Sequence, residues 1–230
     1  MKSKGFIIFF VIVVMTYFTG MALQNDTILF IFKPLLVTSL LLYFISATRR
    51  SKSSLKAFVA LALIFSIAGD TLLMFAGNNE RFFLLGLSAF LIAHIFYIIT
   101  FHKIKIGENI EDRWQWAIVV AIYYFFIISI LMPRLGEMKI PVLAYGLVIS
   151  FMLLVAMLLY DLPENKAARY ILTGAVLFVL SDSILAINRF YRPFSAGGWM
   201  IMITYVSAQY LLVKGLVRYL NHKQIVLTDF

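Results

Sequence analysis

Two aspartates stand inside long apolar stretches of this 230-residue sequence, where a charged side chain is costly. Asp70 lies in the run from Leu55 to Ala76, and Asp182 lies in the run from Ala168 to Asn188. An ionised side chain at the centre of a membrane costs about 2.5 to 3.5 kcal/mol, so each must face a partner, a bundle interior or water. Two carboxyl groups in one low-dielectric pocket cannot both ionise easily. Such a pair supplies one acid and one base, and we predict that Asp70 and Asp182 are catalytic.

Other uses of a membrane-embedded aspartate compete with catalysis. Asp70 and Asp182 could each bond a neighbouring helix and serve helix packing alone. Intramembrane aspartyl proteases also set two aspartates on different helices, but the Gly-x-Gly-Asp pattern that they need is replaced here by Ile67-Ala68-Gly69-Asp70. A proton-coupled transporter would suit the charges, yet no helix broken by Gly or Pro surrounds either aspartate. The packing role stays open beside the catalytic one.

Further polar side chains occur inside or at the ends of the apolar runs. His94 and Tyr97 share a helix face at a spacing of three, and Tyr205 and Gln209 do so at a spacing of four. Each pair is suited to orienting a substrate or a water molecule, and each would serve equally to bond two helices. Lys33 either pairs inward or extends to the membrane surface, and Asn188 either caps its helix or meets a headgroup. The predicted substrate-binding residues are Lys33, His94, Tyr97, Asn188, Tyr205 and Gln209.

The elements that must position these side chains are membrane-spanning helices. Hydrophobic residues make up 63% of the chain and charged residues 13%, which is far from the composition of a soluble domain. The apolar runs are about 18 to 23 residues long, enough to cross a hydrocarbon core of about 30 Å. We predict an all-α, polytopic bundle of eight spans in one domain, 1–230: Gly5–Leu23, Ile28–Ala47, Leu55–Ala76, Phe82–Phe101, Trp114–Met132, Met138–Tyr160, Ala168–Asn188 and Gly198–Tyr219.

The net charge of +9 indicates orientation in a membrane rather than binding to nucleic acid. The two termini and the second, fourth and sixth loops carry 14 Lys and Arg residues, whereas the first, third, fifth and seventh loops carry 5. The positive-inside rule therefore places both termini in the cytoplasm of a multi-pass protein of the cell membrane. The surplus can also attract anionic headgroups of membrane lipids. We expect the first run to be a retained anchor rather than a signal peptide.

Neither a metal nor a cofactor is predicted. The chain has no cysteine, so thiolate ligands and thiol nucleophiles are excluded. Its three histidines, His94, His102 and His222, are far apart in the sequence and form no pair typical of a zinc site.

The two aspartates also sit in similar surroundings, which suggests an internal repeat of 5–101 and 114–219. In both, a small residue precedes the aspartate and a hydroxyl residue and two aliphatic residues follow it. His94 follows Asp70 by 24 residues, and Tyr205 follows Asp182 by 23. Four helices per unit make the repeat parallel. At 1.5 Å per residue both aspartates lie about 21 to 23 Å from the cytoplasmic start of their helices, and this shared depth predicts one pocket.

Taken together, five segments resemble the YhhN family of bacterial membrane proteins. The likeness extends from about Phe32 to Gly215, and the block from Ser181 to Phe190 is its most specific part. The segments are Lys33-Pro34, Gly69-Asp70-Thr71-Leu72-Leu73, Ala93-His94-Ile95-Phe96-Tyr97, Phe178 to Phe190, and Tyr205-Val206-Ser207-Ala208-Gln209.

The resemblance implies a membrane hydrolase, because animal relatives of the family are lysoplasmalogenases, which hydrolyse the vinyl ether bond of lysoplasmalogens. That reaction needs a positioned acid, a nearby negative charge and a base for water. Asp70 and Asp182 would supply all three, with a lysophospholipid-type substrate entering from the membrane. A non-enzymatic lipid-binding or transport protein that uses the same polar pocket is the alternative. The sequence leaves the oligomeric state open.

Overall fold

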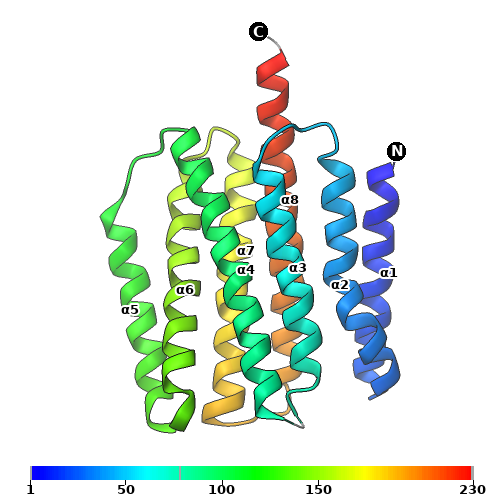
Figure 1. The fold of residues 1–230 in the computed structure, drawn as a ribbon, viewed down its shortest axis with the longest axis vertical. Helices are drawn as coiled ribbons and strands as arrows, with labels where there is room; N and C mark the ends of the chain where they lie inside the picture. The colour runs from blue at the N-terminus through cyan, green and yellow to red at the C-terminus, as the bar shows by residue number, and fades with distance from the viewer. Residues whose placement is uncertain (1, 78, 229–230) are drawn as a thin grey trace. The chain divides into compact units, whose positions relative to one another are not determined.

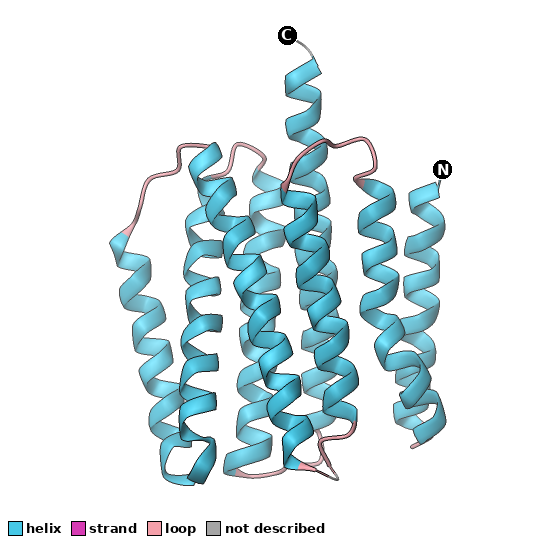
Figure 2. Ribbon diagram, viewed as in Figure 1, coloured by secondary structure: helices cyan, strands magenta, loops and turns pink. Residues whose placement is uncertain are grey.

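The predicted all-helical bundle is confirmed by a computed structural model, which describes residues 2–77 and 79–228. Eight of its helices are long and apolar enough to cross a membrane, and the part of the chain described contains no strand (Figures 1 and 2). The helices are α1 (Lys2–Ala22), α2 (Asp26–Ala47), α3 (Leu55–Met74), α4 (Glu80–Gly107), α5 (Trp114–Leu131), α6 (Lys139–Leu158), α7 (Asn165–Ala186) and α8 (Gly197–Thr228).

Two helices extend further than the apolar runs predict. We placed the end of the fourth span at Phe101, but α4 continues to Gly107. We placed the end of the last span at Tyr219, but α8 continues to Thr228. Hydropathy marks the part of a helix that suits hydrocarbon, whereas the backbone stays helical until a residue ends it. The stretch from His102 to Gly107, which lies beyond the predicted span, is therefore the last part of α4.

Local sequence signals set several other helix ends. The Asn25 side chain accepts a hydrogen bond from the Ile28 backbone N at 3.1 Å and so caps α2. Pro34 lies in the interior of this helix rather than at its opening. At its other end, α7 continues into a π-helical turn, Ile187–Tyr191, before the chain enters the loop to α8.

Two compact units make up the chain. The first comprises Met1–Tyr97 with Val217–Phe230, and in it α1 packs against α2 and α2 against α3. The second comprises Ile98–Leu216, and in it α5 packs against α6 and α6 against α7. The predicted single domain and the predicted repeat of 5–101 and 114–219 remain predictions.

The outer faces of several helices are apolar, as lipid contact requires. Residues with 48% to 68% of their surface exposed include Ile118, Ile122 and Phe125 on α5. Helix α1 exposes Ile12 and Met15 in the same way. In water such faces would drive aggregation, whereas in hydrocarbon they match the solvent.

Helices α7 and α8 approach closely at Gly174. A Cβ atom at this position would lie 2.9 Å from the backbone N of Leu212 and 3.0 Å from the carbonyl O of Ala208. Small residues permit such backbone contact between membrane helices. Because Asp182 lies two turns further along α7, this contact also fixes the helix that carries it.

We predict that Gly174→Val destabilises the protein, because backbone atoms of α8 cannot move away as a flexible side chain can. Overpacking of this kind costs about 1 to 3 kcal/mol, which corresponds to a loss of about 2 to 12 °C in the unfolding midpoint. Thermal unfolding of the purified protein in detergent measures it. Gly5→Val is the matched control, since a Cβ at Gly5 meets nothing within 4 Å. Equal midpoints for the two variants would contradict the prediction.

Candidate active site

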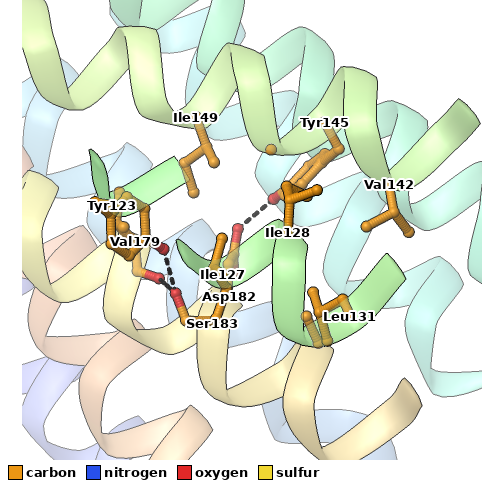
Figure 3. Close-up of a pocket in the computed structure, with 12 residues that line it drawn as sticks. Tyr123, Ile127, Ile128, Leu131, Val142, Tyr145, Ile149, Val179, Asp182 and Ser183 are labelled. Carbon is orange, nitrogen blue, oxygen red and sulfur yellow. Dashed lines mark hydrogen bonds between the residues drawn. The ribbon is translucent and has the colours of Figure 1, made fainter. Parts of the chain in front are cut away.

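A pocket in the second unit opens beside Asp182. It encloses about 360 Å³, open space at its mouth included. Its lining is apolar apart from one carboxyl group and three hydroxyl groups, and all of it comes from α5, α6 and α7 (Figure 3). The lining residues are Tyr123, Ile127, Ile128, Leu131, Val142, Tyr145, Gly146, Ile149, Val179, Asp182, Ser183 and Ala186.

Helical periodicity explains why these residues share one pocket. On α7 the lining positions 179, 182, 183 and 186 are three, four and seven residues apart, which places them on one helix face. Positions 142, 145, 146 and 149 on α6 repeat this spacing, and positions 123, 127, 128 and 131 on α5 nearly do. One face of each of the three helices therefore lines the pocket, and Asp182 lies in the middle of the α7 face.

Tyr145 holds the Asp182 carboxylate. Its hydroxyl group donates a hydrogen bond to Oδ2 of Asp182 across the α6–α7 interface (Figure 3). The tyrosine is buried, with 8% of its surface exposed, so its phenol cannot turn to water. This hydrogen bond between two helices fixes both side chains in a low-dielectric setting.

Two further hydroxyl groups, those of Ser183 and Tyr123, are hydrogen-bonded to each other beside Asp182. The Ser183 hydroxyl donates to the Val179 carbonyl at 2.6 Å. Its proton is thereby used, so the Tyr123 hydroxyl, 2.5 Å from Ser183 Oγ, is the donor in their mutual bond. Tyr123 also interacts electrostatically with Asp182. Both hydroxyl groups face the pocket, where a substrate oxygen or a water molecule can meet them.

Asp70 has its own polar surroundings in the first unit. It lies on α3 with 3% of its surface exposed. Lys33 on α2 and Tyr17 on α1 both interact electrostatically with its carboxylate. This favours the inward pairing of Lys33 over its alternative position at the membrane surface. On α4, His94 and Tyr97 are fully buried, as their shared helix face predicts.

The remaining predicted residues lie outside the Asp182 pocket as described. Tyr205 and Gln209 are buried on α8, and the Gln209 amide donates to the Tyr205 hydroxyl at 3.4 Å. The Tyr205 ring stands edge-on to Phe178, with centroids 5.5 Å apart. Their predicted spacing therefore brings the pair together along one helix.

Asn188 holds the loop that leaves α7. Its Oδ1 accepts a hydrogen bond from the backbone N of Phe194 at 3.0 Å. A Cβ at Gly197 would lie 2.5 Å from the same oxygen, so the loop folds back tightly over the amide. This contact assigns the amide oxygen to the loop rather than to a lipid headgroup.

No three His, Asp or Glu side chains of residues 2–77 and 79–228 lie close enough to hold an ion.

The match to a family model decides the chain's relationship. The YhhN family model aligns with residues 28–216. This chain belongs to the YhhN family. The matched range includes Asp70, Lys33 and the whole Asp182 pocket, whereas Tyr17 lies outside it.

Curated relatives of this YhhN chain carry one functional name. The human protein named lysoplasmalogenase TMEM86B is 32% identical over 159 residues, which are 68% of this chain and 62% of the relative. The Mycobacterium tuberculosis protein named lysoplasmalogenase is 33% identical over 158 residues, 67% of this chain and 58% of the relative. The chain thus spans about three fifths of the length of the relatives that it matches. No solved structure matches.

Sequence reasoning missed four residues of the YhhN chain that surround the aspartates. They are Tyr17, Tyr123, Tyr145 and Ser183. One sequence signal points to Tyr145. It lies seven residues, or about 10 Å, from the start of the predicted span Met138–Tyr160, and Asp182 lies nearly as far from the end of its own span at Asn188. The predicted topology puts these two span ends on the same side of the membrane. The chain has twelve tyrosines, and depth alone does not distinguish Tyr145 from the others.

We predict that Asn188→Ala lowers the unfolding midpoint in detergent by about 2 to 4 °C, because the Phe194 amide loses its acceptor. Asn188→Asp keeps an acceptor and should keep the midpoint. The measurement is made in detergent without phospholipid, so that only the hydrogen bond between Asn188 and the Phe194 backbone N is affected by the substitution. If Asn188 served a headgroup instead, the alanine variant would melt like the wild type in that detergent.

Proposed function

We propose that this YhhN chain is a membrane hydrolase that cleaves the vinyl ether bond of a lysoplasmalogen. The products are a fatty aldehyde and a glycerophospho-headgroup, and no cofactor takes part. The observation that carries the proposal is the Asp182 carboxyl group, held by Tyr145 in an otherwise apolar pocket. The relatives named lysoplasmalogenase support the choice of bond.

The reaction requires the groups that the aspartates offer. An acid transfers a proton to the alkenyl carbon that is not bonded to oxygen, and the ether oxygen then shares the positive charge of its neighbouring carbon as an oxocarbenium ion. A carboxylate stabilises that cation. Water adds to the cationic carbon while a base removes its proton, and the hemiacetal collapses to aldehyde and alcohol. One water is consumed, and the acid and the base are restored.

We assign the acid and the base to Asp70 and Asp182, with either order open. Asp182 stands in the pocket, and Asp70 is almost fully buried beside a cation. Lys33, His94, Tyr97, Tyr205 and Gln209 are proposed to orient water or the glycerol backbone, and Asn188 acts through the loop that it holds. The shared depth of the two aspartates in the sequence supports their joint use.

Substrate selection must come from polar groups. A lipid chain that moves from the bilayer into an apolar pocket gains no hydrophobic free energy, because the lipid is equally apolar. The apolar walls around Asp182 therefore admit an alkenyl chain without favouring it. Discrimination falls to the ether oxygen and to the headgroup.

The proposed setting is the cell membrane, with both termini in the cytoplasm. The excess of Lys and Arg in the even-numbered loops and at the termini supports this orientation. It puts the Asp182 end of the pocket in the outer half of the membrane.

A lipid-binding or transport protein with the same pocket is the rival. Incubating the purified protein with alkenyl and acyl lysophospholipids separates the two readings. Release of aldehyde indicates ether hydrolysis, release of fatty acid indicates a lysophospholipase, and release of neither favours binding or transport.

We predict that Asp70→Asn and Asp182→Asn each reduce aldehyde release at least about 100-fold, since each removes a proton-transfer group. The double variant should be no slower than the slower single variant, because groups that serve one step lose their effect together. Asp26→Asn, at an exposed position at the start of α2, is the control and should stay near wild-type activity. Aldehyde is quantified by a coupled dehydrogenase. Full activity in either single variant would refute the assignment.

We predict that Tyr145→Phe lowers kcat about tenfold and leaves KM nearly unchanged, because the Asp182 carboxyl group loses the hydrogen bond that orients it. Tyr124→Phe is the matched control: its hydroxyl bonds a backbone carbonyl on α6 at 3.3 Å, and it does not line the pocket. Steady-state kinetics with an alkenyl lysophospholipid measure both. A loss of equal size in the two variants would mean that the tyrosines act only through packing.

A further inference from the structure

A cation and an aromatic ring meet where two helices leave the Asp182 pocket. Helix α5 lines the pocket up to Leu131 and then forms a single 3-10 turn, Met132–Arg134. Helix α7 lines it up to Ala186 and then forms the π-helical turn. The Arg134 guanidinium carbon lies 4.1 Å from the ring centroid of Tyr191, the last residue of that turn. The pair therefore joins the two chain segments at one end of the pocket.

Positive charge is concentrated at this end of the second unit. Arg134 and Lys139 lie at the connection between α5 and α6, and Arg189 and Arg192 lie at the connection between α7 and α8. All four are exposed, and Glu137 is the only acidic residue in these connections.

The positive-inside rule does not account for these charges. The connections α1–α2 and α3–α4, which the predicted topology puts on the same side of the membrane, carry in the described chain only Arg81, near the start of α4, against four cations at the α5–α6 and α7–α8 connections. That side is the one the rule keeps poor in Lys and Arg. Cations at the pocket's end thus need a local reason.

The arrangement of Arg134 suits phosphate. A guanidinium that stacks on an aromatic ring uses its flat face and keeps its N–H groups, which lie in its plane, for other partners. Those groups form a fork that matches two phosphate oxygens. Stacking also removes much of the side-chain freedom that a flexible cation would lose on binding.

We propose that Arg134, held over Tyr191, binds the phosphate of a lysophospholipid whose chain lies in the Asp182 pocket. The inference rests on the proposed function for the identity of the ligand. Tyr191 follows Asp182 by nine residues along α7 and its π-helical turn, which is about 13 Å of helix. Because the bilayer gives the alkenyl chain no preference for the pocket, this contact supplies the selection.

Binding of uncleavable analogues tests the site independently of catalysis. An alkyl ether lysophospholipid has the chain and the phosphate, and the matching alkylglycerol has the chain alone. Equilibrium dissociation constants are measured for purified full-length protein in detergent, with Arg134→Gln, Arg134→Lys and Tyr191→Leu as variants. Lys166→Gln is the control, because Lys166 is an exposed cation near the start of α7, at the opposite end of that helix. Unfolding midpoints establish that each variant is folded.

The wild type should bind the phosphate-bearing analogue about tenfold or more tightly than the alkylglycerol. Arg134→Gln should remove that preference and leave alkylglycerol binding unchanged, and Arg134→Lys and Tyr191→Leu should reduce it in part. Lys166→Gln should keep it. A preference that survives Arg134→Gln, or a loss that Lys166→Gln shares, would overturn the proposal. If Arg134→Gln does not fold, the other two variants decide.

Two further experiments are needed. One distinguishes a lysophospholipid from free phosphate as the ligand, and the other distinguishes the Arg134 site from the proposed hydrolase activity. Inorganic phosphate should displace the lysophospholipid analogue poorly, because it lacks the chain; displacement as potent as that by the lysophospholipid would mean a bare anion site and overturn the proposal. With alkenyl substrates, Arg134→Gln should raise KM for the lysophospholipid and not for alkenylglycerol. A wild type that shows the phosphate preference but releases no aldehyde would refute the proposed function and leave the Arg134 site standing.

Discussion

The cost of a polar group in hydrocarbon governs this structure, because each one inside a span must be satisfied by a neighbouring helix or by water. The bonds that result are specific. Tyr145 on α6 donates to Asp182 on α7, and the Ser181 hydroxyl of α7 donates to the Ile201 carbonyl of α8 at 3.0 Å. In the first unit, Asp70 interacts with the charge of Lys33 from the neighbouring helix. Polar side chains thus determine which helix faces meet, where apolar packing alone would allow several arrangements.

The same constraint bears on the acid–base chemistry that we propose. A carboxyl group that is bonded across a helix interface is already oriented, so little reorganisation would accompany the proposed proton transfer. The Asp182 pocket combines this with hydroxyl groups from Tyr123 and Ser183 and with walls that are otherwise apolar. A packing role therefore does not exclude the proposed catalytic role of Asp182, because the hydrogen bond that satisfies its carboxyl group also orients it.

Much of the fold was predictable because hydrocarbon thickness dictates span length, and the eight apolar runs correspond to eight helices. The predicted ends of α4 and α8 were wrong, because a helix continues past the apolar run until a residue stops it. Depth singled out Asp70 and Asp182 but not their partners: residues at one depth can face any direction, and only packing shows that Tyr145 faces Asp182. The role of Asn188 depended on a loop whose course no periodicity describes. That Asp70 and Asp182 share one pocket remains a prediction.

The π-helical turn at the end of α7 sets the direction in which the residues beyond it face. Its backbone N–H of Arg192 bonds the carbonyl of Ile187, five residues earlier, at 2.9 Å. This turn uses one residue more than an α-helical turn, so everything beyond it is rotated by about 100° relative to a regular helix. An insertion or deletion of one residue here would swing Tyr191 to another side while positions 179 to 186 kept their face. Evolution can thus alter what the pocket's rim presents without disturbing the carboxylate beneath it.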